Sequence, residues 1–334
     1  MHENIAMPLE RAPSPAVSFH IPELACSDPP RIHPDYPAID ERCAAWVRAF
    51  LPSADEAARQ RLLEYRVPMW TCMIFPEGTA DRVFVASCVS VLIMFIDDLP
   101  LVRQAFADGD GLSLLAGHPA AAAFADVLRR LKPEMPVPLY RRYRDEWLRW
   151  FESVSHEGDL QSRGQVLTFE PFLELRSINS AMLPCIVYAE HLYDLDLGDL
   201  IAADPELRLA IQATNEYVLV SNDIYSYRKE HAAGVTLNAM ASLRWAHGLT
   251  AQDAVHFLAS RLKALDDRRS RLCETLRHRH AGRPDADRFE RYLASFGAMC
   301  AGQLRWHLEQ PRYSGGEGHG WNWTRERHVV LDSD

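Results

Sequence analysis

The sequence predicts an all-α protein built as a single domain. Few stretches of its 334 residues alternate polar and apolar side chains with a period of two, the pattern of half-buried strands. Instead, segments with helical patterning are separated by short turn sequences at residues 108–111, 134–138 and 157–159. The chain contains no internal repeat and no second block of distinct composition, which favours one helical core.

The first 34 residues are rich in proline, which is not tolerated in a helix interior, so we expect an N-terminal segment without helices. A helical domain is expected over residues 35–313. Its helices are predicted at residues 36–51, 54–66, 79–98, 119–131, 137–156, 169–193, 205–230, 236–246, 250–279 and 284–309. Residues 314–334, with several glycines and charged side chains, are predicted to form a mobile tail.

The most apolar of these helices ends in two aspartates. Residues 83–96 read VFVASCVSVLIMFI, and Asp97 and Asp98 follow directly. The run is too short to span a membrane, which requires roughly 18 or more apolar residues, so it predicts a buried core helix. Two adjacent carboxylates at the end of a buried helix repel each other unless a cation neutralises them. The alternative is that both acids emerge into solvent as the helix ends at Pro100, and a metal site is favoured once the polar residues of a second helix are considered.

A second group of polar residues lies on the helix predicted at 205–230. Asn222, Ser226 and Glu230 are four residues apart, and at about 3.6 residues per turn they share one helix face. The residues before them are largely apolar, which predicts a buried helix, and asparagine and serine are poor choices for a solvated helix interior. Amide, hydroxyl and carboxylate oxygens together suit Mg²⁺. Lys229 adds a positive charge suited to phosphate oxygens.

Composition limits the classes of partner. The net charge is −10 and there is no long basic run, which argues against nucleic acid and against an anionic membrane surface. Seven cysteines without a C-x-x-C pair indicate core thiols in a reducing compartment rather than a disulfide framework. The first residues lack a charged region followed by an apolar one, so we expect no signal peptide and a cytoplasmic protein.

These motifs resemble those of bacterial class I terpene synthases. The sequence N-D-x-x-S-x-x-K-E at residues 222–230 matches the second metal motif of that family at every defined position. The pair Asp97 and Asp98 lies upstream, where the family has its aspartate-rich motif. Arg312 and Tyr313 lie downstream, where the family carries a pair that binds diphosphate, and Arg176 is similar in place to the family's diphosphate-sensing arginine. The resemblance covers roughly residues 25–315.

The resemblance implies a single-domain helical bundle around a central apolar cavity, in which three Mg²⁺ ions help to ionise a linear isoprenyl diphosphate. It implies that Asp97 bridges two of these ions and that Asn222, Ser226 and Glu230 bind the third. Asp98 is expected to orient an arginine rather than to bind metal.

The same resemblance assigns the groups that hold the diphosphate. Arg176, Lys229, Arg312 and Tyr313 are expected to donate hydrogen bonds to its oxygens. Asp223, which lies beside the metal ligands in the motif, is expected to support its neighbours and not to bind metal. The N-terminal segment is expected to fold over the mouth of the site when it closes.

The sequence departs from the family at two places. Leu99, Pro100 and Leu101 follow the aspartate pair, so the third acid that the family usually carries is missing, which bears on how tightly this end of the site holds its two ions and on how fully the site closes. Four residues after Arg176, Ser180 takes the place of a small residue at a helix break whose carbonyl points into the cavity. An ordinary helical serine is the alternative interpretation of Ser180.

A carbocation in an apolar cavity is stabilised by the faces of aromatic rings, by about 2 kcal/mol when desolvated. Phe95, one turn before the aspartates, and Trp306, on the helix before the arginine–tyrosine pair, are candidates for the cavity wall. Trp70 and Phe75 are further candidates. For each of the four, the alternative is a side chain that simply fills the core.

The sequence therefore predicts a Mg²⁺-dependent terpene cyclase, a carbon–oxygen lyase that releases diphosphate and forms a terpene hydrocarbon or alcohol. Farnesyl diphosphate is slightly preferred as the substrate over geranylgeranyl diphosphate. Two alternatives stay open: a weakly active or non-catalytic relative that binds prenyl diphosphate, and a chain-elongating prenyltransferase. Dimerisation is common in the family, and no stretch of the sequence identifies an interface.

Overall fold

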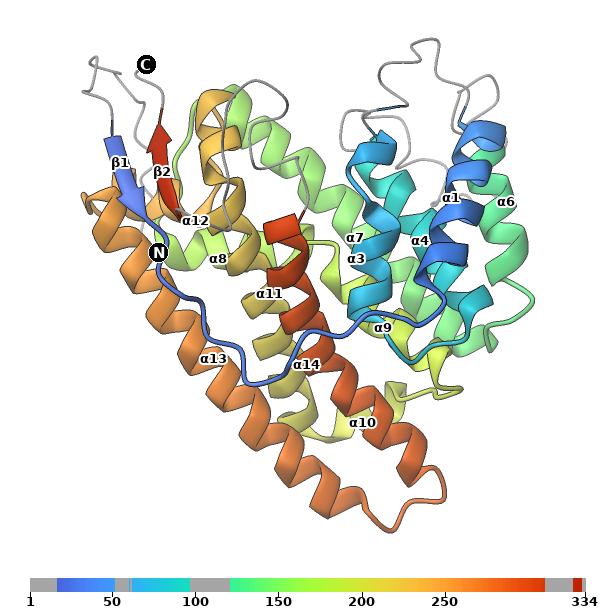
Figure 1. Ribbon diagram of the computed structural model, residues 1–334. Helices are drawn as coiled ribbons and strands as arrows, with labels where there is room; N and C mark the ends of the chain where they lie inside the picture. The colour runs from blue at the N-terminus through green and yellow to red at the C-terminus, as the bar shows by residue number, and fades with distance from the viewer. Residues whose placement is uncertain (1–16, 52–59, 61, 97–120, 310–326, 332–334) are drawn as a thin grey trace.

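The computed structural model confirms the all-α prediction and describes residues 17–51, 60, 62–96, 121–309 and 327–331, without the side chains of residues 95 and 96 (Figure 1). Two long helices, α11 (Pro205–Ala232) and α13 (Ala251–His280), pack along each other, and α14 (Ala286–Glu309) contacts both. The remaining helices are α1 (Tyr36–Phe50), α3 (Val67–Ile74), α4 (Ala80–Ile96), α6 (Ala121–Leu131), α7 (Val137–Ser162), α8 (Phe169–Asn179), α9 (Met182–Leu192), α10 (Gly198–Ala203), α12 (Ala239–Ala241) and a π-helical turn at Ser242–Ala246.

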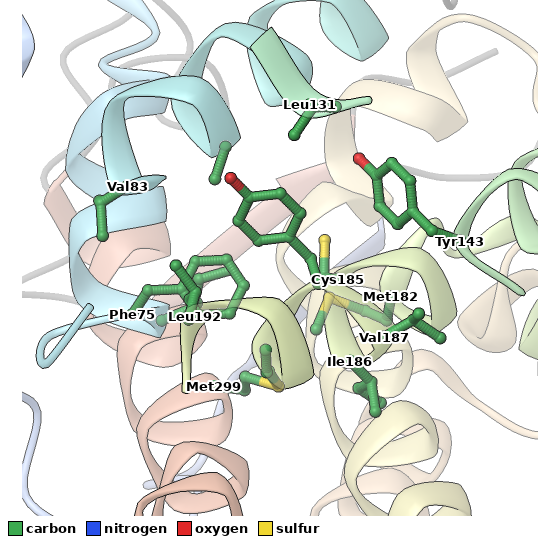
Figure 2. Close-up of a cluster of buried hydrophobic side chains, with 14 of the residues drawn as sticks. Phe75, Val83, Leu131, Tyr143, Met182, Cys185, Ile186, Val187, Leu192 and Met299 are labelled. Atoms are coloured by element: carbon green, nitrogen blue, oxygen red, sulfur yellow. The ribbon is translucent and has the colours of Figure 1, made fainter. Parts of the chain in front are cut away.

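Two hydrophobic clusters form the core. One gathers side chains mainly from α1, α3, α4, α6, α7 and α9, and Figure 2 shows part of it. The other lies between α11, α13 and the two short strands. Helix α11 contributes side chains to both clusters, because it is buried around most of its circumference. The polar motif at residues 222–230 is therefore carried by a largely buried helix, as the sequence predicts.

The start of α11 has a clear local cause. Asp204 accepts hydrogen bonds from the backbone N–H groups of Glu206 and Leu207 at 2.9 and 3.3 Å, and so caps the helix. Pro205 occupies the first turn, where its missing N–H costs nothing. This start sets the register that brings the motif to the other end of the helix.

The helix predicted at residues 169–193 is wrong as a single element, because the chain divides it into α8 and α9. Ala181 takes a left-handed conformation with φ of 59° between them. In a continuous helix the backbone N–H of residue 184 would donate a hydrogen bond, and Pro184 has no N–H. In the first turn of α9 no such hydrogen bond is made, so the proline is tolerated there. The small residues 180 and 181 thus form a break that faces the interior.

Other boundaries also differ from the prediction. Helix α7 continues through Gly158, where a break was expected, and ends before Gly164, which adopts φ of 61°. The short helices α3 and α10 were not predicted, because a few residues give too little periodicity. The helix expected at 236–246 is reduced to α12 and the π-helical turn. Most of the helix expected at 54–66 lies outside the described residues.

The expectation of no sheet is wrong for one small ribbon. Strands β1 (Val17–His20) and β2 (His328–Leu331) pair antiparallel, so part of the tail predicted to be mobile is held in place. An isolated two-stranded ribbon is only marginally stable, so packing must support it. Phe19 provides that packing, with its ring centroid 6.2 Å from that of Tyr227 on α11.

The segment between β1 and α1 lies over α13 and α14 (Figure 1). As predicted, residues 17–34 contain no helix. Arg269 on α13 is 3% exposed and donates to Asp28 and to Asp266, each at 2.6 Å. The Tyr217 hydroxyl donates to the carbonyl of Ala25 at 2.6 Å. These buried contacts fix the segment to the helical body.

The cysteines agree with expectation. All seven cysteines are free, and six of them are buried, as core thiols should be. Among the helices in the described ranges, none combines the length and apolarity that a membrane span requires.

Helices α14 and α3 approach closely at Gly302. A Cβ atom added there would lie 2.9 Å from the backbone of Met73, closer than such atoms approach without displacing the chain. The contact sets Trp70 of α3 against Trp306 of α14, with ring centroids 6.3 Å apart. The absence of a side chain at Gly302 therefore determines where two large aromatic residues meet.

We expect Gly302→Ala to lower the free energy of unfolding by about 1–3 kcal/mol, because the helices must separate to admit the methyl group. Gly158→Ala is the control: it lies within helix α7, and no described atom falls within 4 Å of its added Cβ. That change should stabilise by about 0.5–1 kcal/mol. Urea denaturation of both variants measures the difference, and equal effects of one sign would contradict the packing argument.

Candidate active site

The polar motif of α11 faces a cavity of about 290 Å³. Asn222, Lys229 and Glu230 line it, while the preceding turn of the same helix contributes Val218 and Leu219. The cavity wall therefore changes from apolar to polar along α11, toward the C-terminal end of the helix. Glu157, Arg176 and Asn179, from α7 and α8, are further polar lining groups.

The rest of the wall is mainly apolar and aromatic. Trp70, Trp150 and Trp306 come from α3, α7 and α14, three helices far apart in sequence. Further lining side chains are Ile93, Met94, Val154, Met182, Cys185, Val235 and Leu237. A chamber with an apolar wall and one polar side suits a ligand that has a hydrocarbon part and a charged end.

Arg176 connects the polar groups. Its guanidinium donates to Asp223 through Nε at 3.1 Å and Nη2 at 3.0 Å, to Asn179 Oδ1 at 3.0 Å and to Asn222 Oδ1 at 3.1 Å. Asn179 donates in turn to the carboxylate of Glu157. A single arginine thus joins helices α7, α8 and α11 at the polar side of the cavity.

Asn238 fixes the other side of this network. Its amide donates to the backbone carbonyl of Asp223 and to Glu230 Oε2, both at 2.9 Å. The second carboxylate oxygen of Asp223 accepts from the backbone N–H of Ala239 at 2.9 Å. Asp223 is fully buried and therefore serves as a structural anchor between Arg176 and α12.

The electrostatics of the site are set by carboxylates that surround Arg176. Burial raises the pKa of Asp223 to about 6, with Arg176 acting to lower it and Glu230 to raise it. The pKa of Arg176 is raised by the carboxylates of Asp223, Glu157 and Glu230, against the effect of burial. The carboxylates of Asp223, Glu157 and Glu230 outnumber the two basic side chains at this side of the cavity, Arg176 and Lys229, and a bound cation would reduce that excess of negative charge.

Ser226 provides a direct test of whether the motif suits a metal ion. Its hydroxyl is buried and makes no hydrogen bond to any described residue, although such an oxygen normally has a partner. It lies on the same helix face as Asn222 and Glu230, which border the cavity, while Ser226 itself is not among the described lining residues. Three oxygen atoms on one face, one of them without a partner in the described part of the chain, fit a hard divalent cation.

This ligand set differs from sites built mainly of carboxylates and histidines. Within the described ranges, no three His, Cys, Asp or Glu side chains are grouped to hold a metal ion. Of the three predicted ligands in the motif, only Glu230 is such a residue, and the other two are an amide and a hydroxyl.

Several predicted site residues cannot be placed. Asp97, Asp98, Arg312 and Tyr313 lie outside the described residues, and so does the side chain of Phe95. Their roles stay predictions. The helices that lead to them, α4 and α14, both contribute lining residues to the cavity.

Of the cavity aromatics predicted from the sequence, two line the chamber and one does not. Trp70 and Trp306 are lining residues. Phe75 is missing from the described lining and belongs instead to the core cluster of Figure 2, with its ring centroid 6.0 Å from that of Tyr188. Helix α3 ends at Ile74, and Phe75 follows it, so its ring turns away from the cavity.

The helix break places Ser180 on the cavity wall together with Ala181. The hydroxyl of Ser180 donates to Asn215 Oδ1 at 2.8 Å, and the amide of Asn215 donates to the carbonyl of Ser177 at 2.7 Å. Trp150 donates through Nε1 to the carbonyl of Asn179 at 2.9 Å. The broken backbone is therefore held by side chains on both sides, and Ser180 is not an ordinary helical serine.

Several polar groups of the site were not predicted from the sequence. These are Glu157, Asn238, Gln303 and His307, and Asn215, which supports the break. Asn238 could have been found as a helix N-cap, because its side chain accepts from the backbone of Met240. The others carry no local signal, since their partners are brought together only by the packing of distant helices.

Comparison with known proteins points to one family. The protein-family model described as "Terpene synthase family 2, C-terminal metal binding" matches residues 96–266. The alpha-muurolene synthase of Coprinopsis cinerea is 24% identical over 91% of this chain and 76% of its own length. A sesquiterpene synthase of Cyclocybe aegerita is 24% identical over 92% of this chain and 93% of its own.

Solved structures show the same fold. The crystal structure of an a-eudesmol synthase superposes with a TM-score of 0.76 at 17% identity and covers 86% of this chain and 99% of its own. The linalool/nerolidol synthase of Streptomyces clavuligerus gives 0.74 at 23% identity, with 85% and 100% coverage. A further structure of that enzyme is in complex with 2-fluorogeranyl diphosphate.

The anchor formed by Asp223 leads to a stability prediction. Asp223→Leu would leave Arg176 buried without its main partner, so the free energy of unfolding should fall by about 3 kcal/mol or more. Asp267→Ala, which removes an exposed carboxylate paired with Lys263, is the control and should change stability little. Chemical denaturation of both variants gives the comparison, and an equally small effect for Asp223→Leu would argue against an anchoring role.

Proposed function

Because this chain belongs to the terpene synthase family, we propose that it is a Mg²⁺-dependent cyclase that ionises a linear isoprenyl diphosphate and releases diphosphate. The observation that carries the proposal is the face formed by Asn222, Ser226 and Glu230 at the polar side of an apolar chamber. The family match supports a terpene synthase that uses metal, without assigning a bacterial branch.

The charges of the reaction require both parts of the site. When diphosphate leaves an allylic carbon, a carbocation and a leaving group of high negative charge form together, and an apolar medium does not stabilise their separation. Bound Mg²⁺ would supply positive charge at the diphosphate oxygens. Asn222, Ser226 and Glu230 would hold one such ion, and Asp97 two more by analogy with the family.

The basic side chains would bind the diphosphate directly. Arg176 and Lys229 line the polar side of the chamber, so their N–H groups can donate to diphosphate oxygens. Arg312 and Tyr313 are proposed to add further donors. Asp223 accepts two hydrogen bonds from Arg176, which orients the guanidinium before the ligand arrives.

The apolar wall would direct the fate of the cation. Trp70 and Trp306 present adjacent rings in the chamber, and Trp150 adds a third. Such rings attract a cation without reacting with it as a base would. Exclusion of water by this wall favours cyclisation over capture of the cation as an alcohol.

Farnesyl diphosphate, the C15 prenyl diphosphate, is our first choice of substrate. The relative from Cyclocybe aegerita bears the name sesquiterpene synthase, and one structural neighbour was solved with a fluorinated geranyl diphosphate. Both support a prenyl diphosphate as the substrate class. Geranylgeranyl diphosphate is the second choice.

The direct test is to incubate purified protein with C10, C15, C20 and C25 prenyl diphosphates, with Mg²⁺ or with EDTA, and to analyse the products by mass spectrometry. We expect a cyclic terpene from the C15 substrate in Mg²⁺ and none in EDTA. A requirement for isopentenyl diphosphate would indicate a chain-elongating prenyltransferase instead. No turnover by folded protein would favour a binding protein disabled at residues 97–101.

Ser226 allows the metal site to be tested without confusing it with stability. Because the hydroxyl of Ser226 has no partner among the described residues, Ser226→Ala should leave the metal-free protein as stable as the parent, or slightly more stable. Turnover at limiting Mg²⁺ should fall by at least about tenfold.

Ser221→Ala is the matched control for this change. Ser221 lies on the same helix, and its hydroxyl donates to the carbonyl of Val218 at 2.9 Å. The Ser221→Ala variant should lose a little stability and keep its activity. Unchanged Mg²⁺ dependence in Ser226→Ala would exclude Ser226 as a ligand.

A further inference from the structure

His307 on α14 lies behind the metal motif and is fully buried. Its Nε2 atom is 3.2 Å from the amide nitrogen of Asn222 on α11. Its ring stacks on that of Tyr225, with centroids 4.9 Å apart and an interplanar angle of 15°. A buried imidazole held this rigidly presents a fixed hydrogen-bonding pattern to the motif.

One contact fixes the tautomer of this imidazole. The Nδ1 atom lies 2.7 Å from the backbone carbonyl oxygen of Gln303. A carbonyl oxygen can only accept, so Nδ1 carries the proton and donates it. In the neutral ring Nε2 is then an acceptor, and the group of Asn222 that faces it must be the N–H₂ group.

Gln303 agrees with this assignment. Its amide oxygen accepts from the indole N–H of Trp70, so its own N–H₂ group points to the other side, 3.4 Å from His307 Nε2. Two amide groups, from different helices, therefore direct their donors to the same imidazole nitrogen.

The opposite side of Asn222 imposes the same orientation. Arg176 Nη2 lies 3.1 Å from Asn222 Oδ1, and a guanidinium can only donate. The amide of Asn222 therefore has its nitrogen toward His307 and its oxygen toward the polar side of the cavity. A rotated amide would face donor to donor on the Arg176 side and acceptor to acceptor on the His307 side.

We propose that His307 is a positioning residue for the metal site, which holds the amide of Asn222 with its oxygen directed toward the cation. Only the oxygen of an asparagine side chain can bind Mg²⁺, and the helix alone does not determine which way its amide faces. This inference rests on the proposed function, since it concerns a ligand of the proposed metal ion.

The test compares Mn²⁺ binding, by electron paramagnetic resonance in the presence of inorganic diphosphate, among four proteins. His307→Phe keeps a planar ring against Tyr225 but removes the acceptor, and His307→Gln restores an acceptor at a similar distance. His191→Phe, a change at another buried histidine on α9 that is missing from the described cavity lining, is the control for the cost of replacing a buried imidazole.

We expect His307→Phe to weaken Mn²⁺ binding by about tenfold or more, the usual effect of removing a group that orients a metal ligand. His307→Gln should remain within about threefold of the parent, and His191→Phe should be unchanged. Thermal unfolding of each variant shows whether a loss of Mn²⁺ binding is accompanied by a loss of stability. Equal binding in His307→Phe and the parent would overturn the proposal.

Combining His307→Phe with Asn222→Asp separates a role of His307 in orienting the amide of Asn222 from a role in general packing. Asn222→Asp carries two equivalent oxygens, so its orientation needs no partner, and His307→Phe should then change Mn²⁺ affinity by less than about threefold. An equal loss in both backgrounds would overturn the positioning role. If the parent protein itself fails to bind Mn²⁺ with diphosphate, the proposed function fails, and the inference fails with it.

Discussion

The buried contact between Arg176 and Asp223 is the interaction on which the site depends. An arginine taken from water is costly unless its donors find acceptors, and here they are met by Asp223, Asn179 and Asn222. Because these acceptors belong to α8 and α11, satisfying one guanidinium fixes the relative position of both helices. The proposed metal ligands and Arg176, which is proposed to bind diphosphate, are therefore coupled parts of one network.

This network explains how a polar motif can lie on a largely buried helix. Asn238, at the start of α12, donates to Glu230, and His307 on α14 contacts Asn222, so the two outer residues of the proposed ligand set are each held by a second helix. Ser226, between them, keeps a buried hydroxyl for which the described residues offer no hydrogen-bond acceptor or donor. Such an oxygen is unfavourable in the metal-free protein, and the proposed cation would supply its missing partner.

The sequence was sufficient to predict the elements with strong local patterns. The period of α11 and α13, the acid-terminated run of α4 and the spacing of residues 222–230 all follow from the chain alone. The ribbon of β1 and β2 could not be predicted, because its strands are four residues each and lie at opposite ends of the chain. Phe75 was assigned to the cavity from its type and position, but the end of α3 turns its ring into the core. Glu157 and His307 were missed because neither belongs to a motif, and only the packing of α7 and α14 brings them to the site.

The central claim is that Asn222, Ser226 and Glu230 bind one divalent cation at the polar side of the cavity. The most direct measurement is a crystal structure of the protein soaked with Mn²⁺ and inorganic diphosphate, with the metal located by its anomalous signal. The account predicts a Mn²⁺ ion bound by Asn222 Oδ1, Ser226 Oγ and a Glu230 carboxylate oxygen, with diphosphate near Arg176. A fully occupied diphosphate whose metal ions avoid all three of these side chains would contradict it.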